Sequence, residues 1–238
     1  MDRDKLWNWE YAFEVFPLIF DAIWITFSAT ILGFILAAIV GLILALGRRS
    51  KQAVIRYPVI GFIEFIRSTP LLVQLFFIFF ALPQIPVIGL TLEPMVAGVI
   101  GLGLHYSTYL SEIYRSGIDS IAKGQWEAST SLNFSRYHTW TKVILPQAIP
   151  PVIPMFGNYL IVMFKETPML MSISVAEMMY VAQTLGSAQW RYIEPITIVG
   201  LLFLALSYPS AYLVRRLEAR MGQRFSKKKK LTREEVTM

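Results

Sequence analysis

The stretch "GQWEASTSLNFSRYHTWTKVILPQAIPPVIP", from Gly124 to Pro154, is polar and basic and then proline-rich, in a chain that is otherwise mostly apolar. Residues 120–132 have the pattern of a short amphipathic helix, which Asn133 can end because asparagine tolerates the left-handed conformation used at helix ends. Ser135 is a suitable N-cap for a second helix through about residue 144. The stretch therefore predicts a helix–turn–helix knob. The prolines that follow are acceptable only in a first helical turn or at a kink, and they mark the return to apolar sequence: Pro146, Pro150, Pro151 and Pro154.

The composition of the chain is that of an integral membrane protein. Of the 238 residues 55% are hydrophobic and only 16% are charged, well below the roughly 25% of ordinary soluble domains, and the mean hydropathy is +0.52. A helix needs roughly 20 mainly apolar residues to cross the hydrocarbon core. Five stretches are long enough: about 16–46, 58–82, 94–114, 150–174 and 195–214. We expect an all-α fold with about five transmembrane helices and the knob between the third and fourth.

The loops predict the orientation of the chain. The first span is expected to be retained, because its flank is acidic and its apolar run is too long for a signal peptide. Lysine and arginine in short loops mark the cytoplasmic face. They lie between spans one and two, between spans three and four, and after span five: Arg48, Arg49, Lys51, Arg56, Arg115, Lys123, Arg136, Lys142, Arg215, Arg216, Arg220, Arg224 and Lys227 to Lys230. The other two loops, about 83–93 and 175–194, hold only Arg191. We expect the N-terminus outside and the C-terminus in the cytoplasm.

This topology divides the chain into three segments. They are an extracytoplasmic segment at 1–15, a transmembrane domain at 16–214 with the knob in a loop at about 119–146, and a basic cytoplasmic tail at 215–238. The formal charge of +6 lies on the predicted cytoplasmic side, so nucleic-acid binding is not needed to explain it. The lysine run of the tail favours contact with anionic lipid, with a specific binding role as the alternative. With no cysteine and two histidines, neither a metal site nor another cofactor is expected.

Small residues recur every fourth position in the first span and place a narrow packing stripe on one helical face: Ala29, Gly33, Ala37, Gly41 and Ala45. The alternative is chance in a span rich in alanine and glycine.

Ionisable residues inside apolar spans are functional candidates because they are costly to keep there. Glu64 and Arg67 are three positions apart and can pair on one helix face, and the Thr69-Pro70 step after them predicts a kink. Lys165 and Glu166 lie near the end of the fourth span, before Thr167 and another proline. An equally weighted alternative is that both pairs sit near an interface and hold helices together.

The knob carries four aromatic residues expected to be exposed on a charged body, which is typical of a docking surface: Trp126, Phe134, Tyr137 and Trp140.

At these residues the chain resembles a known family. "EASTSLNFSRYHTWTKVILPQA" is similar to the EAA loop of ABC importer permeases, whose pattern is Glu-Ala-Ala, three residues, Gly, about nine residues, then an apolar residue before Leu-Pro. The matching positions are Glu127, Ala128, Leu145 and Pro146. Ser129 replaces the second alanine, and Asn133 replaces the glycine but keeps the tolerance for a left-handed turn.

Other segments resemble the permeases for polar amino acids, and the resemblance covers about residues 15–220. They are "EFIRSTPLLVQLFFIFF", "YLSEIYRSGIDSIAKGQWEAS" and "FKETPMLMSISVAEMM". The last resembles a Lys-Asp-Thr-Ser-Leu segment implicated in the transport path, with Glu166 replacing Asp and Pro168 replacing Ser. Within this branch the chain looks most like subunits that import ectoine or hydroxyectoine, which are compact zwitterions.

The resemblance implies a permease subunit in a bacterial inner membrane. Two such subunits would form the pathway, two cytoplasmic ATPases would close on ATP, and an extracytoplasmic binding protein would deliver a small zwitterionic solute. Glu127 would brace the knob, as coupling helix, through hydrogen bonds or an arginine. The chain has no G-x-x-x-x-G-K-[ST] loop, so we do not expect it to be an enzyme.

The sequence favours two rival functions less. In an ion-coupled secondary transporter, Glu64, Lys165 and Glu166 would form the ion relay, but five spans without a visible inverted repeat argue against it. An integral-membrane enzyme would need a nucleophile–base pair or a cluster of metal ligands, and none is visible in the sequence.

Overall fold

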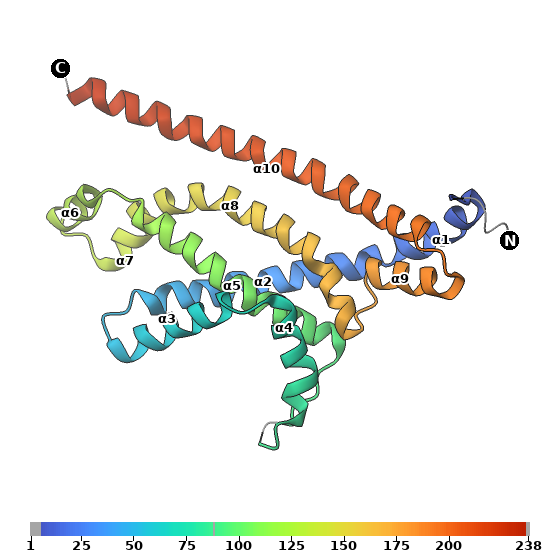
Figure 1. The fold of residues 1–238 in the computed structure, drawn as a ribbon. Helices are drawn as coiled ribbons and strands as arrows, with labels where there is room; N and C mark the ends of the chain where they lie inside the picture. Colours follow the sequence, from blue (N-terminus) through green and yellow to red (C-terminus); the bar gives the residue numbers. More distant parts are fainter. Residues whose placement is uncertain (1–5, 88, 237–238) are drawn as a thin grey trace.

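The computed structural model describes residues 6–87 and 89–236, with side chains described as far as residue 221. In these residues the fold is entirely helical, which confirms the predicted fold class (Figure 1). The α-helices are α1 (Trp9–Asp21), α2 (Ile23–Arg48), α3 (Ala53–Arg67), α4 (Leu71–Phe76), α5 (Pro94–Asp119), α6 (Lys123–Ser131), α7 (Arg136–His138), α8 (Leu145–Glu166), α9 (Met178–Gln189) and α10 (Ile193–Val236). Tighter or wider helical turns cover Phe77–Ala81, Leu82–Gln84, Thr139–Ile144 and Thr167–Ile173.

Fewer than the five predicted spans are apolar enough to cross a membrane by length and composition. In the described residues three helical segments qualify, Trp9–Arg48, Arg136–Ile173 and Ile193–Met221. A bent pair, Ala53–Arg67 with Leu71–Gln84, makes a fourth if its two helices form one span. The predicted span at 94–114 is α5, which does not qualify. Its glycine, serine, threonine and histidine residues lower its hydropathy, but most are buried against other helices. The helix is therefore covered by protein and does not need an apolar surface all round.

The predicted stripe of small residues is a packing face. Its five members, Ala29, Gly33, Ala37, Gly41 and Ala45, are all buried, and α2 lies along α5. A Cβ atom on Gly41 would lie 2.9 Å from the backbone oxygen of Ser107 and 3.1 Å from the Cβ of Leu110. Glycine is required here because the two helices approach almost to backbone contact.

The kink predicted at Thr69-Pro70 is a complete break. The axes of Ala53–Arg67 and Leu71–Gln84 differ by 105°, and Pro70 has an extended backbone at the start of α4. Side chains satisfy backbone groups freed by the break: the Thr69 hydroxyl donates to the carbonyl of Phe65 at 3.0 Å, and the Gln74 amide donates to that of Ile66 at 2.7 Å. A proline kink alone would turn the chain less.

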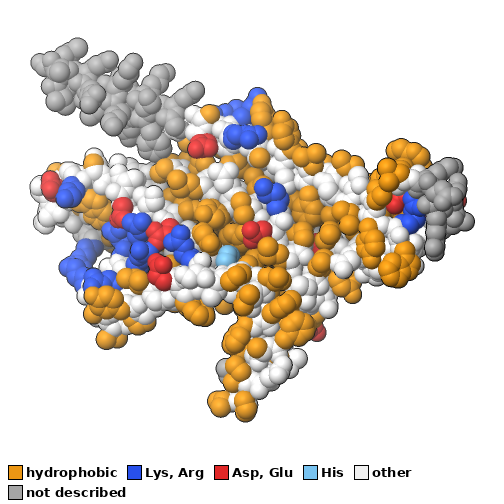
Figure 2. Space-filling model, in the orientation of Figure 1, with side chains coloured by type: hydrophobic (Ala, Val, Ile, Leu, Met, Phe, Trp, Pro, Cys, Tyr) orange, Lys and Arg blue, Asp and Glu red, His pale blue; other side chains and the backbone are white. Residues whose placement is uncertain are grey.

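The two ends of the bundle differ in character. The short helices α6 and α7 lie at one end, and α9 with the start of α1 lies at the other (Figure 1). Lysine, arginine and acidic side chains gather near the α6 end (Figure 2). At the opposite end Glu177 is fully buried and caps α9 by accepting from the backbone N–H of Tyr180 at 2.8 Å. Burial raises the pKa of Glu177 to about 7, so this carboxyl takes up a proton near neutral pH.

We predict that Gly41→Leu destabilises the protein far more than Gly200→Leu. A side chain at position 41 forces α2 and α5 apart, and overpacking costs about 1–3 kcal/mol or more. A Cβ on Gly200, in α10, meets no other atom within 4 Å. Thermal unfolding in detergent should show a clear loss only for the first variant, and equal losses for both would contradict the packing described here.

Candidate functional site: the helical knob and a polar face of the bundle

The first turn of the knob forms as the sequence predicts. Helix α6 ends at Ser131, and Asn133 has a left-handed backbone with φ of 56°. The backbone N–H of Phe134 then donates to the carbonyl of Ser129 at 3.0 Å. Ser135 caps the next helix by accepting from the backbone N–H of His138 at 3.2 Å. The predictions for Asn133 and Ser135 are therefore confirmed.

The second half of the knob differs from the prediction. The chain was expected to leave its helix near residue 144, but α7, a π-helical segment and α8 run on without a gap as far as residue 166. The prolines at positions 150, 151 and 154 lie inside α8. The wide π turn comes directly before Pro146, whose missing N–H interrupts regular bonding, and the Gln147 side chain donates to the carbonyl of Val143 at 2.7 Å. The knob is thus continuous with a predicted span.

Two of the four aromatic residues expected on the knob surface instead hold it together. Trp126 and Trp140 are only partly exposed, and their rings pack edge to face at 5.3 Å, joining α6 to the π segment. The prediction that they are exposed is wrong because each ring shields the other. Phe134 and Tyr137 are exposed as predicted, Tyr137 by 77%.

The residues that match the EAA loop have different surroundings. Ser129 is buried, and its hydroxyl donates to the carbonyl of Gln125 at 2.8 Å. Glu127 is exposed and has no hydrogen bond or ion pair with any residue that the structure describes. The contact by which Glu127 would brace the knob, as the resemblance implies, is therefore not made with any of the described residues. Of the other matching residues, Ala128, Asn133 and Pro146 are exposed, and Leu145 is half-buried.

A network of ion pairs fastens the end of α2 to the end of α5 near the knob. Arg115 reaches Glu112 at 2.8 Å and Asp119 at 2.9 Å, while Arg48 pairs with Glu112 and Arg49 pairs with Asp119. Each pair is partly exposed and contributes only about 0–1 kcal/mol to stability. The network therefore stabilises this end of the bundle through several weak pairs together. In the sequence these arginines indicate only the orientation of the chain. The spacing of Glu112, Arg115 and Asp119 on one helix face could have revealed the pairs.

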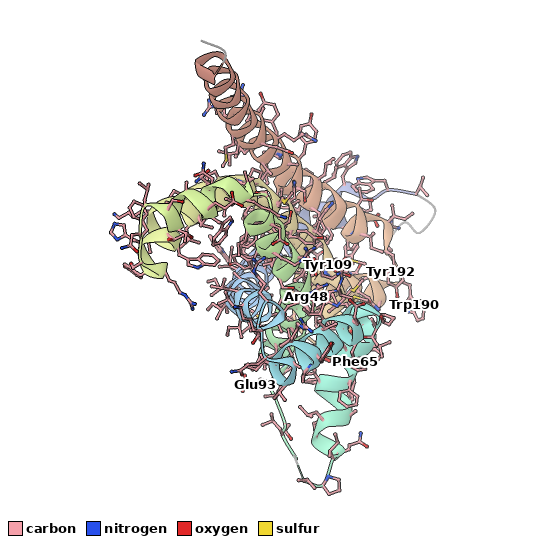
Figure 3. All side chains as sticks on the ribbon, turned by 90° about the vertical axis from the view of Figure 1, so that its left-hand side faces the viewer. Arg48, Phe65, Glu93, Tyr109, Trp190 and Tyr192 are labelled. Atoms are coloured by element: carbon pink, nitrogen blue, oxygen red, sulfur yellow. The ribbon has the colours of Figure 1, made fainter. Side chains whose placement is uncertain are left out.

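Beside this network lies a polar cavity of about 420 Å³. It is lined by residues of α3, α5 and α8: Arg67, Tyr109, Glu112, Ile113, Arg115, Ser116, Met155, Asn158 and Tyr159. Three tyrosines from α5 and α8 form an aromatic wall. Tyr109 and Tyr159 line the cavity, and Tyr106 lies next to both of them. The ring centres of Tyr109 and Tyr159 are 5.7 Å apart, and that of Tyr106 is about 6 Å from both. The Arg67 guanidinium stands 5.1 Å from the centre of the Tyr109 ring (labelled in Figure 3).

Polar contacts continue beyond the tyrosine wall. Tyr106 donates its hydroxyl hydrogen to Glu166 at the end of α8. His105 shares a hydrogen bond of 3.1 Å with Gln74, which also donates to the Thr69 hydroxyl at 2.7 Å. Two neighbouring residues of α5 therefore carry separate polar contacts, His105 toward the break between α3 and α4 and Tyr106 toward the end of α8. Tyr106, Tyr109 and His105 were missed because an apolar span hides which of its faces is turned toward polar neighbours.

The structure separates the five predicted pathway residues. Arg67 and Glu166 both border the tyrosine wall. The predicted pairing of Glu64 with Arg67 is wrong: the two side chains form no ion pair, and Arg67 lies over an aromatic ring of α5 instead. Glu64 and Lys165 are exposed in this single chain. Thr167 is buried and donates to the carbonyl of Phe164 at 2.8 Å, so it shapes the end of α8.

The helical bundle, with a helix–turn–helix knob at one end, has the fold of type I ABC importer permeases. Residues 37–223 match the family described as "Binding-protein-dependent transport system inner membrane component". The chain belongs to this family and is a permease subunit of an ABC importer, in which ATP hydrolysis is carried out by a separate subunit. An ion-coupled transporter is not favoured by this membership.

Individual proteins show the same relationship. The chain is 37% identical over 214 residues to "Probable amino-acid ABC transporter permease protein y4tG" of Sinorhizobium fredii (strain NBRC 101917 / NGR234), covering 90% of this chain and 91% of the relative. It is 38% identical over 216 residues to "L-cystine transport system permease protein TcyB" of Bacillus subtilis (strain 168), covering 88% and 91%. The solved structure "Crystal structure of an amino acid ABC transporter with histidines" matches with a TM-score of 0.83 at 32% identity, covering 90% of this chain and 99% of that one.

Proposed function

We propose that this chain lines the translocation pathway of an importer for a polar amino acid or an amino-acid-derived compatible solute, with ectoine or hydroxyectoine first. The relatives support the substrate class, since they are named as amino-acid and cystine permeases. The narrower substrate rests on the resemblance of the segments at 62–78, 109–129 and 164–179. The chain would work in a bacterial inner membrane, with its N-terminal segment 1–15 outside and its tail 215–238 in the cytoplasm.

The observation that carries the proposal is the continuity between the knob and the polar face, by which we mean the polar cavity together with the tyrosine wall. Residues Arg136–Ile173 form one helical run, which starts in the knob and carries Asn158, Tyr159 and Glu166 along the polar cavity and the tyrosine wall. The edge-to-face packing of Trp126 and Trp140 makes the knob one body. A force applied to the knob by an ATPase would therefore move residues of the pathway, which is the coupling between two sites that alternating access needs.

The knob has the surface that an ATPase partner would bind. Leu132, Phe134 and Tyr137 are exposed on the knob, as is Glu127. Exposed aromatic side chains on the same knob as an unpaired carboxylate suit a protein interface better than water. We assign coupling to the six residues that match the EAA loop: Glu127, Ala128, Ser129, Asn133, Leu145 and Pro146.

The polar face has groups suited to a zwitterion. Arg67 and Glu166 offer one positive and one negative charge at the tyrosine wall, and tyrosine faces attract a delocalised cation such as a cyclic amidinium. We keep Glu64, Lys165 and Thr167 as pathway residues, the first two because exposed charges in a membrane subunit call for a cover such as a second permease copy or homologue. An extracytoplasmic binding protein would deliver the solute, and membrane lipid would surround the bundle.

We predict that Glu127→Lys uncouples the complex. Replacing the carboxylate by a cation should cost about 2 kcal/mol or more of coupling free energy, so solute-stimulated ATP hydrolysis should fall more than about tenfold toward the basal rate. Glu218→Lys, the same charge change at an exposed site of α10, should leave it unchanged. Normal stimulation of ATP hydrolysis in an assembled Glu127→Lys complex would show that Glu127 has no role in coupling.

We predict that Glu166→Gln alters uptake more than assembly, because it removes the negative charge that Tyr106 holds at the tyrosine wall. Uptake should fall by about tenfold, the effect of losing one charged hydrogen bond. Glu93→Gln, at an exposed site before α5, is the matched control. An unchanged uptake rate and solute preference in Glu166→Gln would reduce this carboxylate to a structural link.

The solute itself is tested with the complex reconstituted in vesicles. Loaded with its binding protein and ATP, it should accumulate labelled ectoine in preference to arginine or glutamate, because the charges of the polar face favour neither a cation nor an anion. Transport of arginine or glutamate without transport of ectoine would overturn the proposed solute assignment but not the permease function. Uptake driven by an ion gradient without ATP would instead support the secondary-transporter alternative.

A further inference from the structure

The break between α3 and α4 frees backbone carbonyls, and the Gln74 side chain takes up two of them. Pro70 has no N–H, so the carbonyl of Ile66, four residues earlier, loses its usual helical donor. Gln74 Nε2 replaces that donor at 2.7 Å and also donates to the carbonyl and the hydroxyl oxygen of Thr69, at 3.0 and 2.7 Å. The amide of Gln74 therefore ties the start of α4 to the end of α3.

These bonds also decide what the other atom of the Gln74 amide can do. With three acceptors around Nε2, the oxygen Oε1 must point away from the break. It lies 3.1 Å from Nδ1 of His105, a buried residue of α5. Because an amide oxygen only accepts, Nδ1 of His105 carries the hydrogen and donates it. His105, Gln74 and the freed carbonyls thus form one directed hydrogen-bond chain from α5 to the end of α3.

The residue that this chain holds in place is Arg67, next to Ile66 at the end of α3. Its guanidinium stands 5.1 Å from the ring centre of Tyr109 and lines the polar cavity. The Arg67 side chain is exposed, and a cation–π contact at an exposed site is too weak to hold it alone. Its position therefore depends on where the backbone of α3 ends.

The chain meets α5 on the face that carries the partner of Arg67. His105 and Tyr109 are four residues apart, so both lie on one face of α5, and their ring centres are 5.4 Å apart. The end of α3 is thus fastened to α5 one helical turn from the ring over which the guanidinium of Arg67 lies.

We propose that Gln74, bonded to His105, is a positioning residue that keeps Arg67 at the polar cavity. Gln74 is not among the residues that line this cavity, so it acts through the end of α3. Without its amide the break loses its hydrogen-bonded link to α5, and the guanidinium is no longer directed over Tyr109. The inference rests on the proposed function, in which Arg67 belongs to the pathway.

The test is a double-mutant cycle in the reconstituted complex, measured as uptake of whichever labelled solute, ectoine, arginine or glutamate, the unmodified complex accumulates. Gln74→Leu and Arg67→Gln should each lower uptake about tenfold. The double variant should lose no more than Arg67→Gln alone, because a positioning residue then has nothing to position. Gln84→Leu is the matched control and should leave uptake unchanged. Gln84 is an exposed glutamine that donates to the carbonyl of Phe80, in its own turn, at 2.8 Å.

His105 supplies a second pair of variants, which decides the matter if Gln74→Leu does not assemble. His105→Leu removes the donor to Gln74 and should lower uptake as Gln74→Leu does. His105→Gln keeps a side-chain N–H that can donate to the same oxygen, so it should recover most of the lost uptake.

Three results would overturn the inference. Losses that multiply to about a hundredfold in the double variant would show that Gln74 acts independently of Arg67. Normal uptake by Gln74→Leu, or no recovery by His105→Gln over His105→Leu, would show that the hydrogen bond positions nothing. Normal uptake by Arg67→Gln would refute the pathway role of Arg67 itself, so a failure of the proposed function is distinguishable from a failure of this inference alone.

Discussion

The close packing of α2 on α5 is the constraint on which the rest of the structure depends. Alanine and glycine at every fourth position of α2 let the helices approach until Gly41 nearly touches the backbone of Ser107. Covered by α2 and also by α3, α4 and α8, α5 carries buried polar groups such as Thr108 and Ser111, which would be costly against lipid. Their hydroxyls donate to carbonyls of their own helix, Ser111 to Thr108 at 2.7 Å. A polar helix can therefore stand inside an apolar bundle.

With α5 held there, the rest of its surface supplies the polar groups of the proposed pathway. Tyr106 meets Glu166 of α8, Tyr109 meets Arg67 of α3, and Glu112 pairs with Arg48 at the end of α2. The uninterrupted run from the knob into α8 then brings the proposed ATPase contact and this polar face onto one element. A transporter needs such an element with two packed arrangements that both sites can bias.

Features set by near neighbours in the chain could be predicted from the sequence. Asn133 turns the knob because of its own backbone tolerance, Ser135 caps a helix three residues on, and the small residues of α2 follow a helical period. Features set by distant neighbours could not. At the 105° break after Arg67 the Gln74 side chain caps a free carbonyl, and Trp126 is partly covered by Trp140.

The same distinction applies to the charged residues of the candidate site. Spacing alone suggested that Glu64 pairs with Arg67, but the ring of Tyr109, far along the chain, offers the guanidinium another partner. Glu112 and Asp119 form ion pairs with Arg48 and Arg49, which the sequence identified only as charges of a cytoplasmic loop. The polar residues of α5 lowered its hydropathy without showing that other helices cover it. Hydropathy thus identified the fold class but not the internal polar face to which we assign transport.

The central claim, that motion of the knob opens and closes the polar face, is tested most directly by thiol accessibility. The chain has no cysteine, so Asn158→Cys would place the only thiol of this subunit in the lining of the polar cavity. In the reconstituted complex a membrane-impermeant thiol reagent should react with it from the cytoplasmic side without nucleotide. The reaction should slow several-fold when the ATPases are trapped with ATP, and the slowing should disappear when Glu127→Lys is added. A reaction rate that is the same in both nucleotide states would contradict the account.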